Sequence, residues 1–154
     1  MEFTVNHRAF VLQRNLRGTP RHAFRFWSDH KLKRQWTSCH PDWLVVEDSF
    51  NFEVDGKECI RWRMPDQTKM AMVAHFLEIA PAERLVYAYA MRSGTKTISS
   101  SLVTVEFTAS AGNTLMTWTE QAVFDSVATG DMRESGTGVG LNRLIEAMAA
   151  GAPA

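Results

Sequence analysis

The segment Asp131–Ala149, near the end of the chain, most restricts what this sequence can fold into. It is the only long stretch after residue 40 whose apolar residues repeat with a helical period. Leu141, Leu144, Ile145 and Met148 recur at positions i, i+3, i+4 and i+7, which places them on one apolar stripe of a helix. The preceding chain offers mainly strands to cover that stripe. We therefore expect this helix to lie across a curved sheet.

Short alternating segments separated by turns precede this helix. His7–Leu16 predicts a first strand, and Thr19 followed by Pro20 is typical of a helix start. Two short helices are expected to follow. About six more strands are then predicted between residues 43 and 124, with a hairpin turn at Asp55-Gly56. Because no crossover helix separates these strands, they should form an antiparallel meander.

The order of these elements and the composition bound the class of protein. A strand, two short helices, about six strands and one long helix predict an α+β fold. The 154 residues fit one domain, 1–154, with a frayed tail at 150–154. Lys plus Arg and Asp plus Glu number 17 each, so the formal net charge is zero. Charge therefore gives no reason to expect a nucleic acid or an anionic membrane as partner.

Targeting and metal-binding signals are weak. The first residues, MEFTVNHRAF, lack the apolar core and cleavage site of a signal peptide, and no apolar run approaches the roughly 20 residues of a membrane span. Cys39 and Cys59 suggest free thiols in a reducing compartment. Cys39-His40-x-Asp42 holds metal-capable side chains, but such close neighbours cannot easily converge on one ion. We expect a soluble cytoplasmic protein without metal or cofactor.

Glu120 is the first candidate for a functional residue. It follows Met116 and Trp118 on one face of a predicted strand, so it points inward if they do. An unpaired buried carboxylate costs several kcal/mol or stays protonated, so it needs a partner, a ligand or a catalytic task. The alternatives are that Glu120 lies near water at the end of the strand or pairs with an arginine such as Arg133.

His75 is the second candidate. It shares a predicted strand face with Leu77 and Ile79. From that face it could reach Tyr87 or Glu120, and a histidine with a carboxylate can act as an acid/base pair. The alternative is a histidine in the core or at its rim with satisfied hydrogen bonds.

Loose motifs along the whole chain resemble one protein family. In chain order they are Arg14; Pro20, Phe24, Trp27, Asp29, Leu32 and Trp36; Asp55-Gly56; Pro81-x-x-Arg84-Leu85-Val86; Thr114-x-x-Thr117-x-Thr119-Glu120; and Gly140-Leu141-x-x-Leu144. Their order and spacing are similar to those of the START/SRPBCC superfamily, and most closely resemble homologues of the activator of the heat-shock-protein-90 ATPase. Two departures concern Asp55-Gly56, where the family usually has Gly-Gly, and Leu141, where an aromatic residue often follows the glycine.

The resemblance implies a helix-grip fold, in which a curved antiparallel sheet wraps around the long C-terminal helix. It also implies a cavity between this helix and the concave face of the sheet. The alternative is that the same side chains fill a dry core. The side chains expected to line the cavity are Trp36, Trp62, Met64, Tyr87, Tyr89, Met91, Val103, Val105, Met116, Trp118, Glu120 and Leu141.

The leading functional hypothesis is a non-enzymatic binder of a small apolar molecule, such as a lipid-like or polyketide-like compound. Aromatic and methionine side chains would bury it, and Glu120, His75 and the tyrosines would orient it. The resemblance leaves two alternatives: a cofactor-independent cyclase or hydrolase that uses Glu120 or His75, and a module that contacts a chaperone. A homodimer is also an open expectation.

Overall fold

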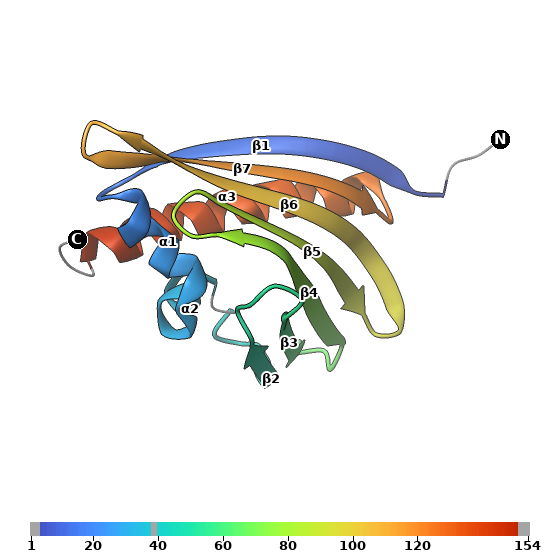
Figure 1. Ribbon diagram of the computed structural model, residues 1–154. Coiled ribbons are helices and arrows are strands. Elements are labelled where there is room, and N and C mark those ends of the chain that lie inside the picture. The colour runs from blue at the N-terminus through green and yellow to red at the C-terminus, as the bar shows by residue number, and fades with distance from the viewer. Residues whose placement is uncertain (1–3, 38–39, 151–154) are drawn as a thin grey trace.

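The computed structural model describes residues 4–37 and 40–150. In these ranges the chain forms one seven-stranded sheet and three helices (Figure 1). The elements are β1 (Asn6–Leu16), α1 (Pro20–Ser28), α2 (His30–Thr37), β2 (Leu44–Phe50), β3 (Lys57–Arg63), β4 (Lys69–Ala80), β5 (Arg84–Ser93), β6 (Lys96–Ser110), β7 (Asn113–Phe124) and α3 (Val127–Ala150).

The sheet is the predicted antiparallel meander. Its strand order is β1-β7-β6-β5-β4-β3-β2, so each strand from β2 to β7 pairs with its neighbour in sequence. β1 pairs antiparallel with β7, from Asn6 opposite Phe124 to Leu16 opposite Thr114. The sheet curves, and α3 runs along its concave side, with α1 and α2 toward one end (Figure 1). The predicted α+β helix-grip fold is confirmed.

Local sequence signals define the two short helices. Thr19 caps α1, because its side chain accepts a hydrogen bond from the His22 backbone N–H, and Pro20 occupies the first turn. Asp29 ends α1 and starts α2, since its Oδ1 accepts from the Leu32 backbone N–H at 3.0 Å. The pair packs inward through aromatic side chains, and the rings of Trp27 and Trp36 lie 4.9 Å apart.

The long helix packs through the predicted apolar stripe, with one correction. Leu141, Leu144 and Met148 are buried, whereas Ile145 is 37% exposed and lies at the edge of the stripe. The helix begins at Val127, earlier than predicted, and runs unbroken to Ala150. Ala150 is therefore helical rather than part of a tail, and residues 151–154, like Cys39, lie outside the described residues. None of the described helices is long and apolar enough to cross a membrane.

Gly56 occupies a position where the surrounding backbone leaves no room for a larger residue. A Cβ at this position would lie 2.3 Å from the Asn51 carbonyl oxygen and 2.8 Å from that of Glu53. Gly136, on α3, has open space where its Cβ would be. We expect Gly56→Ala to lower the free energy of unfolding by about 1–3 kcal/mol through backbone strain. Gly136→Ala should instead raise it by about 0.5–1 kcal/mol, because alanine favours a helix.

Urea denaturation followed by circular dichroism measures both changes. The interpretation of the turn is wrong if Gly56→Ala is as stable as the parent protein while Gly136→Ala behaves as expected.

Candidate functional site

Glu120 is the centre of a polar cluster on the concave face of the sheet. Its side chain is fully buried. Oε2 accepts hydrogen bonds from the Tyr89 hydroxyl and the Ser101 hydroxyl, each at 2.7 Å, and Oε1 accepts one from Trp118 Nε1 at 3.2 Å. Tyr89 pairs with Ser101 across β5 and β6, and Val103 pairs with Glu120 across β6 and β7, so the sheet register brings these groups together.

Arg133 of α3 completes this Glu120 cluster. Its NH1 lies 3.4 Å from Glu120 Oε2 and donates to the Tyr89 hydroxyl at 2.8 Å. Its NH2 donates to Ser99 Oγ at 2.7 Å and to Met91 Sδ at 2.8 Å. Glu120 thus points inward and also pairs with Arg133, which combines two readings that the sequence had left as alternatives. The ion pair fixes the first half of α3 against the sheet.

The hydrogen bonds determine what Glu120 can do chemically. A carboxylate offers about four lone-pair sites, and Tyr89, Ser101, Trp118 and Arg133 supply four donors. A general base needs an oxygen that can reach the substrate proton. Burial, with the nearby Glu120 charge as a further cause, raises the pKa of Tyr89, so that its hydroxyl remains a donor. The four donors therefore fix the Glu120 carboxylate in one position and leave its oxygens no free lone pair for a substrate proton.

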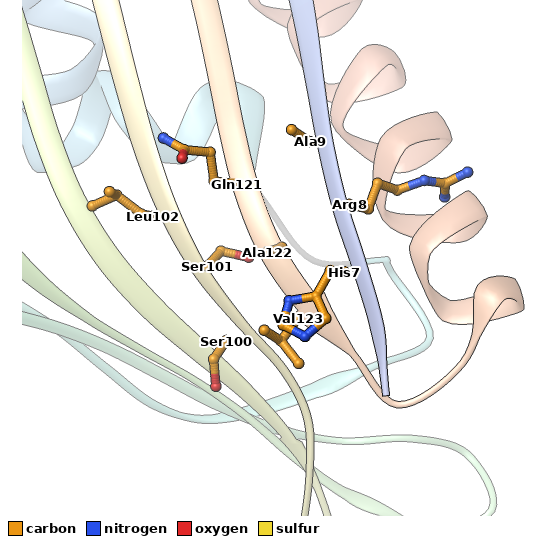
Figure 2. A pocket seen from close by; sticks show the side chains of 9 residues that line it. All are labelled: His7, Arg8, Ala9, Ser100, Ser101, Leu102, Gln121, Ala122 and Val123. Carbon is orange, nitrogen blue, oxygen red and sulfur yellow. The ribbon is translucent and has the colours of Figure 1, made fainter. Parts of the chain in front are cut away.

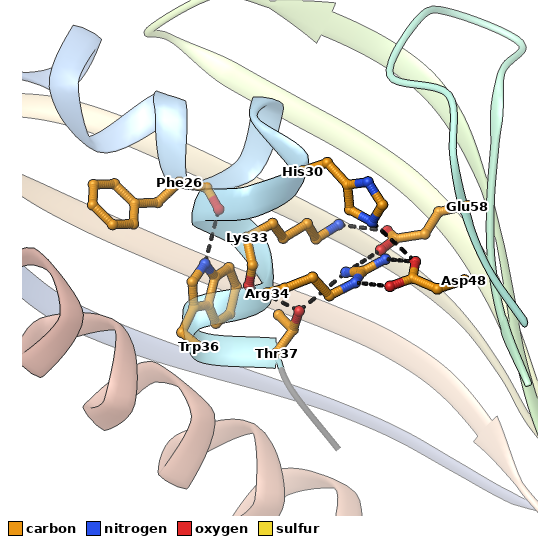
Figure 3. A network of polar contacts seen from close by, with 8 residues as sticks. All are labelled: Phe26, His30, Lys33, Arg34, Trp36, Thr37, Asp48 and Glu58. Carbon is orange, nitrogen blue, oxygen red and sulfur yellow. Dashed lines mark hydrogen bonds and ion pairs between the residues drawn. The ribbon is translucent and has the colours of Figure 1, made fainter. Parts of the chain in front are cut away.

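A second buried ion pair joins α2 to β3, near the edge of the sheet opposite β1 (Figure 3). Lys33 is 6% exposed and Glu58 is 1% exposed, and Lys33 Nζ donates to Glu58 Oε1 at 2.5 Å. Arg34 NH1 lies 2.7 Å from Glu58 Oε2 without the alignment of a hydrogen bond. Arg34 also donates to both oxygens of Asp48, at 2.9 and 2.7 Å, and His30 Nε2 lies 3.0 Å from Asp48 Oδ1.

Aromatic rings surround the Lys33 ammonium group. Its Nζ lies 5.2 Å, 5.7 Å and 5.8 Å from the ring centroids of Phe50, Phe76 and Tyr87. Removal from water lowers the pKa of Lys33, and the negative charge of Glu58 opposes this effect. Cation–π contacts and the ion pair together compensate for the buried charge. We call Lys33, Arg34, Asp48 and Glu58 the Lys33 cluster.

His75 does not lie where the sequence predicted. Its side chain is exposed, and it pairs with Ala88 of β5 on the convex face, away from Glu120. A β-bulge between Phe76 and Glu78 explains the error. Counting alternate residues back from Ile79, which packs on the core, crosses this bulge and assigns His75 to the wrong face. The proposed His75–Glu120 acid/base pair is therefore contradicted.

The other predicted lining residues lie on the concave side or at its border. Val103, Val105, Met116 and Leu141 are fully buried in one hydrophobic cluster, so this part of the predicted lining belongs to the core. The function of the whole set in ligand binding stays a prediction. Trp36, Trp62, Tyr87 and Trp118 are also buried, whereas Met64, Tyr89 and Met91 are partly buried.

Sequence reasoning missed the Lys33 cluster, although weak signals existed. Glu58 alternates with Ile60 and Trp62 on β3, so it had the parity of an inward residue. Lys33 precedes Trp36 by three positions on α2, which places the two on one side of the helix. Nothing in the sequence indicated that these two charges, on separate elements, would meet.

Part of the concave face remains uncovered by the helices. Met70, Met72, Tyr89 and Met91 are only partly buried, and we call these four side chains the methionine patch. Met72 pairs with Met91 across β4 and β5, and Met70 pairs with the buried Trp62 of β3. Trp62 Nε1 is buried and has no hydrogen-bond partner among the described residues.

Two open hollows lie elsewhere on the surface of the described chain. The larger, about 670 Å³, lies on the outer side of β1, β6 and β7 (Figure 2). The smaller, about 360 Å³, lies between β1 and α3, beside Leu12 and Asp131. The smaller hollow thus adjoins α3 only at the edge strand β1, and no residue of the methionine patch lines either hollow.

The two tyrosines of the chain provide a direct test of the concave face. Burial raises the pKa of both Tyr87 and Tyr89 above the ordinary value near 10. Because the folded-state pKa is raised, the folded protein favours the protonated tyrosines. Their contribution to stability is fully present below pH 10 and is lost as the pH rises above it. We expect little tyrosinate absorbance at 295 nm near pH 10, and then ionisation of both tyrosines together with loss of circular dichroism.

Tyr89→Phe should halve the absorbance change in that titration. Gradual ionisation near pH 10, while the circular dichroism of the folded protein persists, would contradict the burial of the two tyrosine hydroxyl groups.

The Lys33 cluster predicts unequal effects for its two central charges. Glu58→Gln leaves Lys33 buried without its carboxylate and should cost about 3–5 kcal/mol of the free energy of unfolding. Lys33→Met should cost less, because Glu58 keeps Arg34 at 2.7 Å. The double variant should be more stable than Glu58→Gln alone. Chemical denaturation of all four proteins measures these differences, and a larger loss for Lys33→Met than for Glu58→Gln would be inconsistent with the cluster.

Comparison with solved structures shows close relatives. A 37% identical structure is that of an uncharacterized protein from Rhizobium leguminosarum, with a TM-score of 0.87 over 94% of this chain and 96% of that chain. The Mll3558 protein from Rhizobium loti is 33% identical, with a TM-score of 0.86 over 94% of this chain and 99% of that one. Protein CV1439 from Chromobacterium violaceum is 16% identical, with a TM-score of 0.72 over 90% and 94% of the two chains, and supports the fold alone.

Comparison with protein families gives one result over most of the sequence. A search of curated proteins found no match. The family model described as "Activator of Hsp90 ATPase homolog 1-like protein" matches residues 17–151. This match covers both short helices, strands β2 to β7 and α3. Together with the shared fold, it shows that the chain belongs to the Activator of Hsp90 ATPase homolog 1-like family within the START/SRPBCC superfamily.

Proposed function

We propose that the protein binds one small, largely apolar molecule at the methionine patch. The observation that carries this proposal is the incomplete burial of Met70, Met72, Tyr89 and Met91 on the inner face of the sheet, next to buried aromatic side chains. Methionine side chains are flexible and polarizable, so they adapt to irregular apolar ligands. A ligand there would remove this apolar surface from water.

Trp62 suggests one polar feature of the ligand. Its Nε1 donor is buried without a partner among the described residues, and an unsatisfied buried donor costs about 1–3 kcal/mol. A carbonyl or ether oxygen on a ligand beside Trp62 could accept this hydrogen bond. Trp62 also stacks on Trp43, with ring centroids 5.8 Å apart and an interplanar angle of 13°. A flat molecule with an acceptor oxygen suits these surroundings.

The Glu120 cluster favours binding over catalysis. The donors of Tyr89, Ser101, Trp118 and Arg133 occupy the carboxylate of Glu120, and His75 lies on the opposite face. Tyr89 belongs both to this cluster and to the methionine patch, so the cluster holds one wall of the proposed site in position. A rigid wall beside flexible methionines reduces the entropy that is lost when a ligand binds.

Fluorescence of the neutral apolar dye N-phenyl-1-naphthylamine tests the proposal. The dye should bind the parent protein and quench tryptophan emission. Met72→Gln should weaken this binding about tenfold, because it replaces an apolar contact worth about 1.4 kcal/mol with a polar side chain. Met132→Gln is the matched control, since Met132 is 75% exposed on α3.

Equal dye affinity for the parent protein and Met72→Gln would refute the methionine patch as the binding site. Native mass spectrometry of the purified protein adds an independent test, because a retained natural ligand should appear as a mass increment that Met72→Gln reduces and Met132→Gln does not.

A further inference from the structure

The convex face of the sheet lacks charge over an unusually broad area. In the described part of the chain, two rows of outward side chains cross the five strands β4, β5, β6, β7 and β1 without an Asp, Glu, Lys or Arg, and the second row reaches a charge only at Lys57 of β3, which pairs with His75. A third row is uncharged on β5, β6, β7 and β1. The rows are Val73, Ala90, Ser100, Val123 and His7; His75, Ala88, Leu102, Gln121 and Ala9; and Val86, Thr104, Thr119 and Val11, with Leu77 beside them at the bulge. We call these fifteen residues the uncharged convex face.

Apolar side chains on this face are exposed to solvent. Val11 is 58%, Leu77 50% and Leu102 37% exposed. The outer face of an antiparallel sheet usually carries polar residues when water covers it. Charged residues lie at the border of this face, where Arg84 forms an ion pair with Glu78. Apolar side chains that are exposed together over a broad face are typical of an interaction site.

Six of the nine residues that line the larger hollow belong to the uncharged convex face (Figure 2). Ala9 and Ser100 are small, and the larger side chains of Leu102, Gln121 and Val123 border them, which leaves about 670 Å³ of open space. In Figure 2 the side chain of Arg8 points away from this group, toward α3. The hollow can therefore receive an apolar side chain from a partner without burying a charge.

The dimensions of the face match a small protein interface. Five strands spaced about 4.8 Å apart and three rows about 6.8 Å apart cover roughly 24 Å by 20 Å. This is nearly 500 Å² on each copy, so two copies would bury about 1,000 Å², the lower limit for a specific interface.

We propose that the uncharged convex face binds a second copy of this chain. A charged partner would lose hydration here without gaining an ion pair. Two copies do not repel each other, because the chain has zero formal net charge. A twofold axis through the face would place each hollow opposite an apolar patch of the other copy, as in face-to-face packing of two sheets. The concave methionine patch would remain free in both copies.

The edge strand β2 also exposes apolar side chains, but it is less suited to pairing with a second copy. β2 is an edge strand on which Leu44, Val45 and Val46 are exposed. Glu47 is the central residue of β2, so antiparallel pairing with a second β2 would bring two Glu47 carboxylates together. Like charges directly opposite each other destabilise such a pair. The convex face is therefore the better surface for self-association.

Sedimentation velocity over a wide range of protein concentration tests the dimer. The parent chain should change from monomer to dimer as its concentration rises, with little dependence on added NaCl, since no charges meet across the interface. Leu102→Lys and Val11→Lys should each weaken the dimer tenfold or more. Val46→Lys is the control, because the Val46 side chain of β2 is 55% exposed and lies outside the uncharged convex face. This variant should dimerise as the parent does.

Circular dichroism melts establish whether the variants fold. If Leu102→Lys does not fold, Val11→Lys provides the test. A parent chain that stays monomeric at every concentration overturns the proposal, whether or not another protein binds the face. Loss of the dimer in Val46→Lys, with dimers retained in Leu102→Lys and Val11→Lys, also overturns it and assigns the interface to β2.

Discussion

The ion pair between Glu120 and Arg133 is the interaction on which the inner side of this protein depends. Glu120 is fully buried, and without Arg133 its negative charge would lie in the core with neutral donors alone. Arg133 also bonds Tyr89, Ser99 and Met91, so one side chain of α3 contacts β5, β6 and β7. Apolar packing through Leu141 holds the second half of the helix. The first half is positioned by charge and hydrogen bonds, which require a specific geometry.

The Lys33 cluster has the same arrangement toward the opposite edge of the concave face. In both clusters a helix supplies the cation, Lys33 or Arg133, and a strand supplies a buried carboxylate. Tyr87 lies between them: burial raises its pKa, and the charges of Glu120 and Glu58 both add to this effect. The two helices are thus fixed at the two sides of the concave face. The apolar strip between them stays partly uncovered, and that strip is where we place the ligand.

Strand periodicity was sufficient to predict most of the inner face. The alternation of Met116, Trp118 and Glu120 indicated three inward side chains, and all three are buried. The same reasoning failed for His75, because the bulge after Phe76 adds a residue that alternation cannot detect. The Lys33–Glu58 pair was not predictable either, since it depends on how α2 docks on β3. The sequence did not determine the function, because this fold supports many activities and only the geometry of a site distinguishes them.

The strands that carry the proposed ligand site also carry the proposed dimer surface, and their pleat keeps the two apart. Ser101 and Val103 point inward, whereas Leu102 between them points outward. A single residue can therefore alter one face without touching the other. The backbone, however, is common to both: a register slip by one residue would expose the Glu120 cluster and bury the convex face. The dense hydrogen bonding around Glu120 penalises such a slip, so the cluster that stabilises the inner face also determines which residues the outer face presents.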